Sequence, residues 1–130
     1  MAFYFHPDVL DNGISLIKAN AERYALIKDY TVLDSYATVV SKIAAVTATI
    51  TTDYTLGDQG TNGRQLTVAA FPTIPVTAAT IIGTNNLHFA WLDDTNSKVL
   101  AVTDETSNRS LEIGDNVTLP LINMKMNQPA

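Results

Sequence analysis

Near the start of the chain, apolar residues recur at helical spacing. Steps of four and three residues separate Leu10, Ile14, Ile17, Ala21 and Tyr24. Side chains with this spacing lie on one face of a helix. Proline needs no backbone donor at a helix start, and an aspartate beside it can accept a bond from a free amide. A glycine in the helix interior costs about 1 kcal/mol relative to alanine, but the spacing still predicts a helix over residues 8–22.

Beyond residue 44 the apolar residues mostly alternate with polar ones, which is typical of strands. The segment 35–52 fits both periods, so we interpret it as an irregular start followed by a strand. The segment 53–63 contains three glycines among polar residues and is typical of a turn. About seven strands are expected, near 44–52, 66–70, 74–82, 86–92, 98–103, 109–113 and 116–125.

Short polar turns such as GTNN and DDTNS separate these strands. Antiparallel strands can be joined by short turns, whereas parallel strands need crossovers of about a dozen residues or more. We therefore expect a mainly β fold: an antiparallel β-sandwich, Ig-like or related, over residues 44–125, preceded by the N-terminal α-helix. The length of 130 residues corresponds to about one domain, so a single domain over 1–130 is expected.

Composition and charge narrow the classes of partner. The chain has eight basic and thirteen acidic residues, a net charge of −5, and no cysteine. The basic residues are scattered between Lys18 and Lys125, which argues against nucleic-acid binding. No apolar stretch reaches the roughly 18 residues of a membrane span, and the opening MAFYFHPDVL does not resemble a secretory signal. We expect a soluble protein that binds neither nucleic acid nor membrane.

Two adjacent carboxylates, Asp93 and Asp94, stand between two apolar runs in HFAWLDDTNSKVLAVT. Aspartate and asparagine are favoured in hairpin loops because their side chains bond to nearby backbone. Glycosidase-type catalysis needs two carboxyl groups held about 5 to 9.5 Å apart across a cleft, and neighbours in one loop rarely meet that demand. We therefore predict that this pair forms a turn rather than an acid pair for catalysis or metal binding.

Other reactive patterns are weak. His6 is near the terminus and His88 lies inside a predicted strand. There is no cysteine and no G-x-S-x-G sequence, and the glycines form no phosphate-binding loop. The segment DQGTNG resembles a calcium loop only superficially, because the spacing of acidic ligands and the terminal glutamate are missing. We expect no enzyme, and no catalytic residue, cofactor or metal ligand is assigned.

Aromatic residues offer two further interpretations. Trp91, Phe89 and Tyr54 fit a hydrophobic core, since aromatic residues that alternate along strands are more often buried. An exposed Trp91 or Tyr54 would instead suit a carbohydrate-binding module. The start MAFYF crowds three large rings into a chain terminus, where they must cover either the domain itself or a partner.

Several segments resemble a family of small virion-associated proteins of tailed bacteriophages. They are HPDVLDNGISLIKANAERYAL, SYATVV, GRQLTVAA, HFAWLDDTNSKVLAVT and SLEIGDNVTLPLINMKM, in this order and over nearly the whole chain. The matching positions are Pro7, Leu10, Asp11, Gly13, Ile17, Asn20, Ala21, Gly63, Arg64, Leu66, Thr67, Val68, His88, Asp93, Ser97, Leu100, Val102, Gly114, Val117 and Pro120. Phe89, Trp91 and Ala101 depart from the pattern of the family's hairpin.

The resemblance implies a structural role in the virion, most simply head decoration that stabilises the capsid. Its partners would be the major capsid protein or other virion proteins, the chain would form a homo-oligomer, and it would reside in the virion after assembly in the host cytoplasm. A tail or baseplate component is the alternative. The residues expected to contact the partner are the aromatic start and the helix, namely Phe3, Tyr4, Phe5, Leu10, Ile14 and Ile17.

Overall fold

A computed structural model shows a mainly β fold with antiparallel pairing and a short helix near the N-terminus. It describes residues 4–5, 13–58, 63–104 and 110–127. In these ranges the strands form a five-stranded sheet of order β1-β8-β7-β2-β3, a three-stranded sheet of order β10-β5-β4 and a two-stranded sheet, β6-β9. The elements are β1 (Tyr4–Phe5), α2 (Ser15–Asn20), β2 (Arg23–Lys28), α3 (Tyr36–Ser41), β3 (Ile43–Ala48), η1 (Thr51–Asp53), β4 (Tyr54–Asp58), β5 (Gly63–Val68), β6 (Phe71–Pro75), β7 (Leu87–Asp93), β8 (Lys98–Asp104), β9 (Asn116–Leu119) and β10 (Ile122–Asn127).

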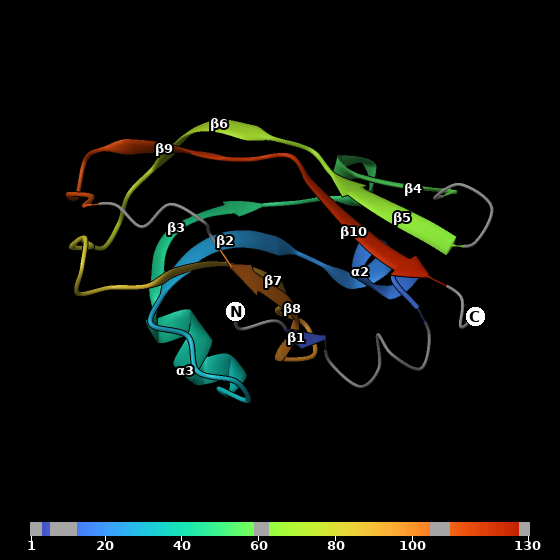
Figure 1. Ribbon diagram of the computed structural model, residues 1–130, viewed down its shortest axis with the longest axis horizontal. Coiled ribbons are helices and arrows are strands. Elements are labelled where there is room, and N and C mark those ends of the chain that lie inside the picture. Colours follow the sequence, from blue (N-terminus) through green and yellow to red (C-terminus); the bar gives the residue numbers. More distant parts are fainter. Residues whose placement is uncertain (1–3, 6–12, 59–62, 105–109, 128–130) are drawn as a thin grey trace.

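The five-stranded sheet is the middle layer of the molecule (Figure 1). On one of its faces, Tyr24, Phe89 and Trp91 pack against Leu66 of β5 and Leu119 of β9 in the main core. This arrangement is a sandwich of one large sheet against two small ones. Burial of one large apolar side chain contributes about 1.5–3 kcal/mol, so this core is the chief source of stability.

The opposite face of the five-stranded sheet is covered by α3. Val39 of α3 is fully buried and packs with Ile27, Leu92 and Val102 in a second, smaller core. The helix begins where the Ser35 side chain accepts a hydrogen bond from the Thr38 amide, which satisfies one of the free donors of the first turn. The apolar residues at helical spacing within 35–43 therefore belong to a helix. The prediction of an irregular segment there was wrong.

The helix predicted over residues 8–22 is much shorter in the structure. Residues 6–12 lie outside the described ranges, and Gly13 has a φ of +79°, which no helix residue adopts. Helix α2 spans Ser15–Asn20, and the backbone is extended at Ala21. The next residues form β2, which lies between β7 and β3 and has four consecutive buried residues. In a strand that is covered on both faces, apolar and polar residues do not alternate. The apolar residues at the start of β2 therefore continued the helical spacing and made the predicted helix too long.

The strand boundaries also differ from those predicted, and β1 and β2 lie before the range 44–125. Strand β4 occupies a segment predicted to be a turn, and β6 ends at Pro75 instead of continuing to 82. Within 109–113, Leu111 makes only an isolated bridge to Thr80. The last predicted strand divides at Pro120 into β9 and β10, which belong to different sheets. Among the described residues, no helix is both long and apolar enough to span a bilayer.

Candidate functional site

The hairpin between β7 and β8 answers the question raised by the paired aspartates. Asp93 is 2% exposed and pairs with Lys98 across the hairpin. Its carboxylate accepts hydrogen bonds from the Asn96 amide at 3.2 Å and from Asn96 Nδ2 at 2.8 Å. Ser97 completes the turn with a φ of +54°. The predicted turn is confirmed, and Asp93 holds it closed.

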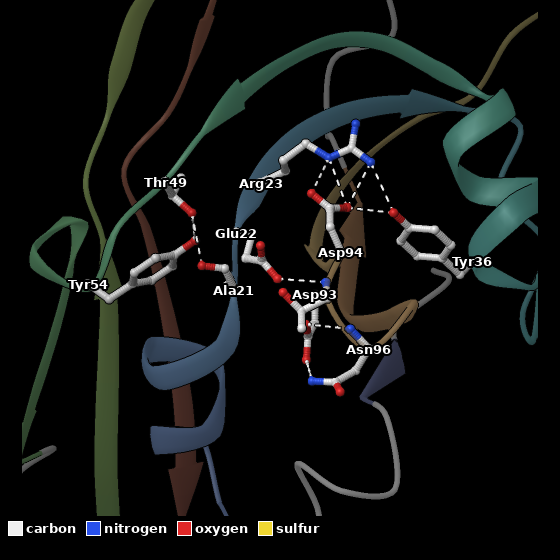
Figure 2. Close-up of polar contacts among 10 residues, drawn as sticks. Ala21, Glu22, Arg23, Tyr36, Thr49, Tyr54, Asp93, Asp94 and Asn96 are labelled. Carbon is white, nitrogen blue, oxygen red and sulfur yellow. Dashed lines mark hydrogen bonds and ion pairs between the residues drawn. The ribbon is translucent and has the colours of Figure 1, made fainter.

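Asp94 has a different role from its neighbour (Figure 2). Its Oδ2 lies 2.8 Å from Arg23 Nε, and its Oδ1 lies 2.8 Å from Arg23 Nη2. The Tyr36 hydroxyl donates a further hydrogen bond of 2.6 Å to Oδ1. Asp94 therefore joins strand β2, helix α3 and the β7–β8 hairpin, with the bidentate geometry that makes arginine–carboxylate pairs strong.

The electrostatics of this cluster favour a fixed charge over a reactive one. Burial acts to raise the pKa of Asp94, but the hydrogen bonds from Arg23 and Tyr36 outweigh it and lower that pKa. The bond to Asp94 raises the pKa of Arg23, against partial burial, and also raises the pKa of Tyr36. At neutral pH the aspartate is thus ionised and its partners protonated. This is an arrangement for positioning the hairpin, not for donating a proton.

Glu22 strengthens the same corner of the molecule (Figure 2). Its Oε1 accepts a 2.7 Å hydrogen bond from the amide of Thr95, the residue that follows Asp94. Within the part of the chain that the structure describes, no three histidine or acidic side chains are close enough to hold a metal ion. His88 is 5% exposed and meets Tyr30 edge-on, with ring centroids 5.7 Å apart. His6 lies outside the described residues.

The aromatic residues considered as a sugar platform are buried. Trp91 is fully buried and stacks on Tyr24 with ring centroids 4.9 Å apart. Tyr54 is 1% exposed, and its hydroxyl lies 2.8 Å from Thr49 Oγ1. Burial raises the pKa of Tyr54 to about 12. Neither ring can stack on a carbohydrate without opening of the domain, so these two residues belong to the core.

The residues predicted to contact a partner fall into three groups. Ile14 and Ile17 are 3% and 0% exposed and pack in the main core, so the folded monomer does not offer their side chains to a partner. Phe3 and Leu10 lie outside the described residues. Tyr4 and Phe5 form β1, which pairs with Val102 and Ala101 of β8 at the edge of the large sheet. Partner contact by the aromatic start stays a prediction.

Among the described residues, large apolar side chains are exposed on several loops, and two of these loops, which the sequence did not single out, carry three isoleucines. Ile81, Ile82 and Ile113 are 57%, 62% and 72% exposed, and we call them the isoleucine end. The two loops are joined because Thr80 and Leu111 exchange backbone hydrogen bonds of 2.9 and 3.0 Å. The sequence signal was present in the TIIGTN and LEIGDN segments, but the isoleucines were assigned to the ends of the strands predicted over 74–82 and 109–113.

Comparisons of the chain with protein-family models, with curated proteins and with solved structures find no match. What the protein does is therefore inferred from its own residues. Two features are available for that purpose: the isoleucine end on the surface and the hydrogen-bonded hairpin beneath α3.

Proposed function

We propose that this protein is a structural component of a tailed-phage virion, a head decoration protein that binds the capsid surface and stabilises it. The observation that carries the proposal is the isoleucine end: Ile81, Ile82 and Ile113 are all more than half exposed on two joined loops. Several exposed large apolar side chains on two joined loops are typical of a protein contact surface. In this proposal the protein acts by adhering to neighbours, as a homo-oligomer in the virion, without nucleic acid or membrane.

The size of the isoleucine end suits repeated, weak binding. Burial of the exposed parts of the three isoleucines, which are 57–72% exposed, would contribute about 3–6 kcal/mol before the costs of association. A micromolar site corresponds to about 8 kcal/mol, so this surface alone gives weak affinity. A capsid presents the same site many times, and linked subunits gain avidity from multivalency. Modest affinity for each copy is therefore sufficient for dense occupancy.

The charges beside the isoleucines indicate the chemistry of the capsid surface. Glu112 and Asp115 flank Ile113 in one turn, in which Asp115 accepts a 2.9 Å hydrogen bond from the Glu112 amide. Asp29 bonds to Asn85 and Asn86 in the neighbouring loop, close to Ile81 in sequence. Lys28 Nζ donates a 3.0 Å hydrogen bond to the Ala79 carbonyl beside the same isoleucines. The surroundings of the isoleucine end therefore carry charges of both signs, which favours a partner with complementary charges of both signs.

Positions shared with the phage family also support the proposal. Gly13 and Gly114 have φ values of +79° and +100°, which glycine alone adopts at little cost. Asp93 and Ser97 shape the hairpin turn. These residues lie at motif positions of the resemblance, so the shared motif corresponds to framework that this fold needs.

The test is an inventory of purified virions by quantitative mass spectrometry, with copy number measured relative to the major capsid protein. Hundreds of copies are expected. About a dozen copies or fewer would instead support the alternative of a tail or baseplate component. Absence of the chain from purified particles would reject both.

A binding experiment then tests the surface. The variant Ile81→Ser/Ile82→Ser/Ile113→Ser should bind undecorated particles at least tenfold more weakly than the parent protein, since loss of about 1.4 kcal/mol corresponds to a factor of ten. Ile50→Ser/Leu121→Ser, at two residues that are 66% and 53% exposed elsewhere, is the matched control and should bind normally. Deletion of residues 1–5 measures the separate contribution of the aromatic start. Equal binding by the triple variant and the control would contradict the proposal.

A further inference from the structure

A pocket of about 230 Å³ opens between the large sheet and the three-stranded sheet, at the edge formed by β8 and β10. Trp91, Ala101 and Thr103 line it from β7 and β8, and Ile122 and Met124 line it from β10. The lining is mainly apolar. A space of this volume is smaller than most small-molecule sites, which measure about 300–1,000 Å³, and it suits a single large side chain.

In the described part of the chain, the strand beside this pocket has one edge that pairs with no other strand. Among the described residues, β10 pairs with β5 alone and ends the order of its sheet. Every other residue of β10 therefore presents its backbone donor and acceptor at this edge, where another strand can be added. In Figure 1, β10 is the red arrow that crosses in front of α2, at the border of the sandwich.

The side chains of β10 define what the added strand must carry. Met124 points into the core and is 6% exposed, whereas the next residue, Lys125, is exposed. Across the existing pair, Lys125 faces Gln65, which is neutral. Within the described ranges, Lys125 forms no ion pair, so no acidic side chain lies across the strands from its ammonium group. Opposite charges directly across two strands stabilise the pairing.

The indole of Trp91 adds a second, independent observation. Its Nε1 is buried and has no hydrogen-bond acceptor in the part of the chain that the structure describes. Buried donors are almost always satisfied, and this one belongs to a residue that lines the pocket. A main-chain carbonyl of an added segment would supply the missing acceptor, so the side chain that fills the pocket can be apolar. Trp91 is also the only tryptophan of the chain, so its fluorescence reports on this site alone.

We propose that the β10 edge accepts an extended segment of a partner protein as a fourth strand. The segment places one large apolar side chain opposite Met124, in the pocket, and an acidic residue opposite Lys125. These are neighbouring positions on a strand, which point to opposite faces, so the recognition element is a large apolar residue followed or preceded by Asp or Glu. The inference is independent of the virion role, because any partner with this element would bind.

The test uses blocked hexapeptides and the full chain. The probe Thr-Thr-Phe-Asp-Thr-Thr should change the Trp91 emission in a saturable manner. Thr-Thr-Ser-Asp-Thr-Thr, which cannot fill the pocket, should leave the emission unchanged. Thr-Thr-Phe-Lys-Thr-Thr should bind more weakly than the Asp peptide, because it places two like charges opposite each other.

Variants of the protein separate the two contacts. Lys125→Glu should weaken binding of the Asp peptide about fivefold and should strengthen binding of the Lys peptide, as expected for one cross-strand charge pair. Lys28→Glu, on β2 of the other sheet, changes the net charge equally and should alter neither affinity. Thr103→Ile, which fills the pocket, should abolish the emission change while circular dichroism stays that of the parent protein. If Thr103→Ile does not fold, the effects of Lys125→Glu on the affinities for the Asp and Lys peptides still test the proposal.

Three results would overturn the proposal. The Phe and Ser peptides could bind equally, or Lys125→Glu and Lys28→Glu could have the same effect. The free protein could also form a dimer that Lys125→Glu dissociates, in light scattering after gel filtration, which would show that a second copy occupies the edge.

Discussion

Arg23 and Asp94 are 71 positions apart in the chain, yet two hydrogen bonds of 2.8 Å join the guanidinium of one to the carboxylate of the other. Both side chains are about one-quarter to one-third exposed. The pair fixes the hairpin to β2, and the Tyr36 hydroxyl adds α3 to the same carboxylate. An exposed ion pair contributes little to stability, but this one is bidentate and shares a third donor.

Asp94→Asn is expected to lower the free energy of unfolding by about 1–3 kcal/mol, because it weakens three charge-assisted hydrogen bonds at once. Urea denaturation monitored through Trp91 emission measures the change. Asp115→Asn is the matched control, since Asp115 accepts a single bond from the Glu112 amide at the surface, and it should cost no more than about 0.5 kcal/mol. A cost for Asp94→Asn as small as that of the control would contradict the role of the cluster.

Stability should fall in acid in a manner that depends on Asp94 and Asp34. The pKa of each is lower in the folded protein than the ordinary value of 3.8, for Asp34 chiefly because of the hydrogen bond from Lys42. A lowered pKa means that the unfolded chain binds protons first as pH falls. The contribution is therefore complete well above the ordinary pKa and is lost as pH decreases through the folded value.

Urea midpoints measured from pH 6 to pH 2 check this dependence. The parent protein should lose stability below about pH 4, and Asp94→Asn should show a shallower loss over the same interval. Parallel curves for the two proteins would exclude a contribution of Asp94.

At alkaline pH the buried Tyr54 controls a second loss of stability. Burial raises its pKa to about 12, against the ordinary value of 10.0. The neutral phenol is favoured in the folded state, so its contribution is complete below pH 10 and is lost as pH rises through about 12. Thermal unfolding of Tyr54→Phe between pH 9 and pH 12 should show a smaller decrease than the parent protein. An identical decrease would mean that other groups cause the alkaline loss.

We expect glycine to be required at position 114 because of its backbone conformation, and not because a larger side chain would clash with neighbouring atoms. Gly114 has a φ of +100°, and a Cβ placed there would meet no atom within 4 Å. Gly114→Ala should therefore cost about 1 kcal/mol through backbone strain alone. Gly57, in β4, has equal space and no positive φ, so Gly57→Ala should be neutral or stabilising by up to about 1 kcal/mol. Differential scanning calorimetry of both variants makes the comparison.

Local sequence predicted the elements whose stabilising contacts are near in the chain. The β7–β8 hairpin was predicted correctly because Asp93 and Asn96 close the turn through contacts only three residues apart. The antiparallel, mainly β class was also predicted, since alternation and short turns report directly on strands joined by hairpins. These features depend on backbone conformation and on bonds within a few residues.

Long-range packing decided the rest. The pattern Ile14, Ile17, Ala21 and Tyr24 predicted one helix, but burial on both faces makes the last part of it a central strand. Hydrophobic periodicity alone does not distinguish such a strand from a buried helix segment, because both are continuously apolar.

The role of each candidate residue likewise emerged only from tertiary contacts. Asp94 has its function through Arg23 and Tyr36, which are distant in sequence. Ile14 and Ile17 are in the core, whereas Ile81, Ile82 and Ile113 are outside it. Isoleucines in similarly apolar segments are thus buried in one case and exposed in the other, because burial depends on which other segments of the chain fold over them.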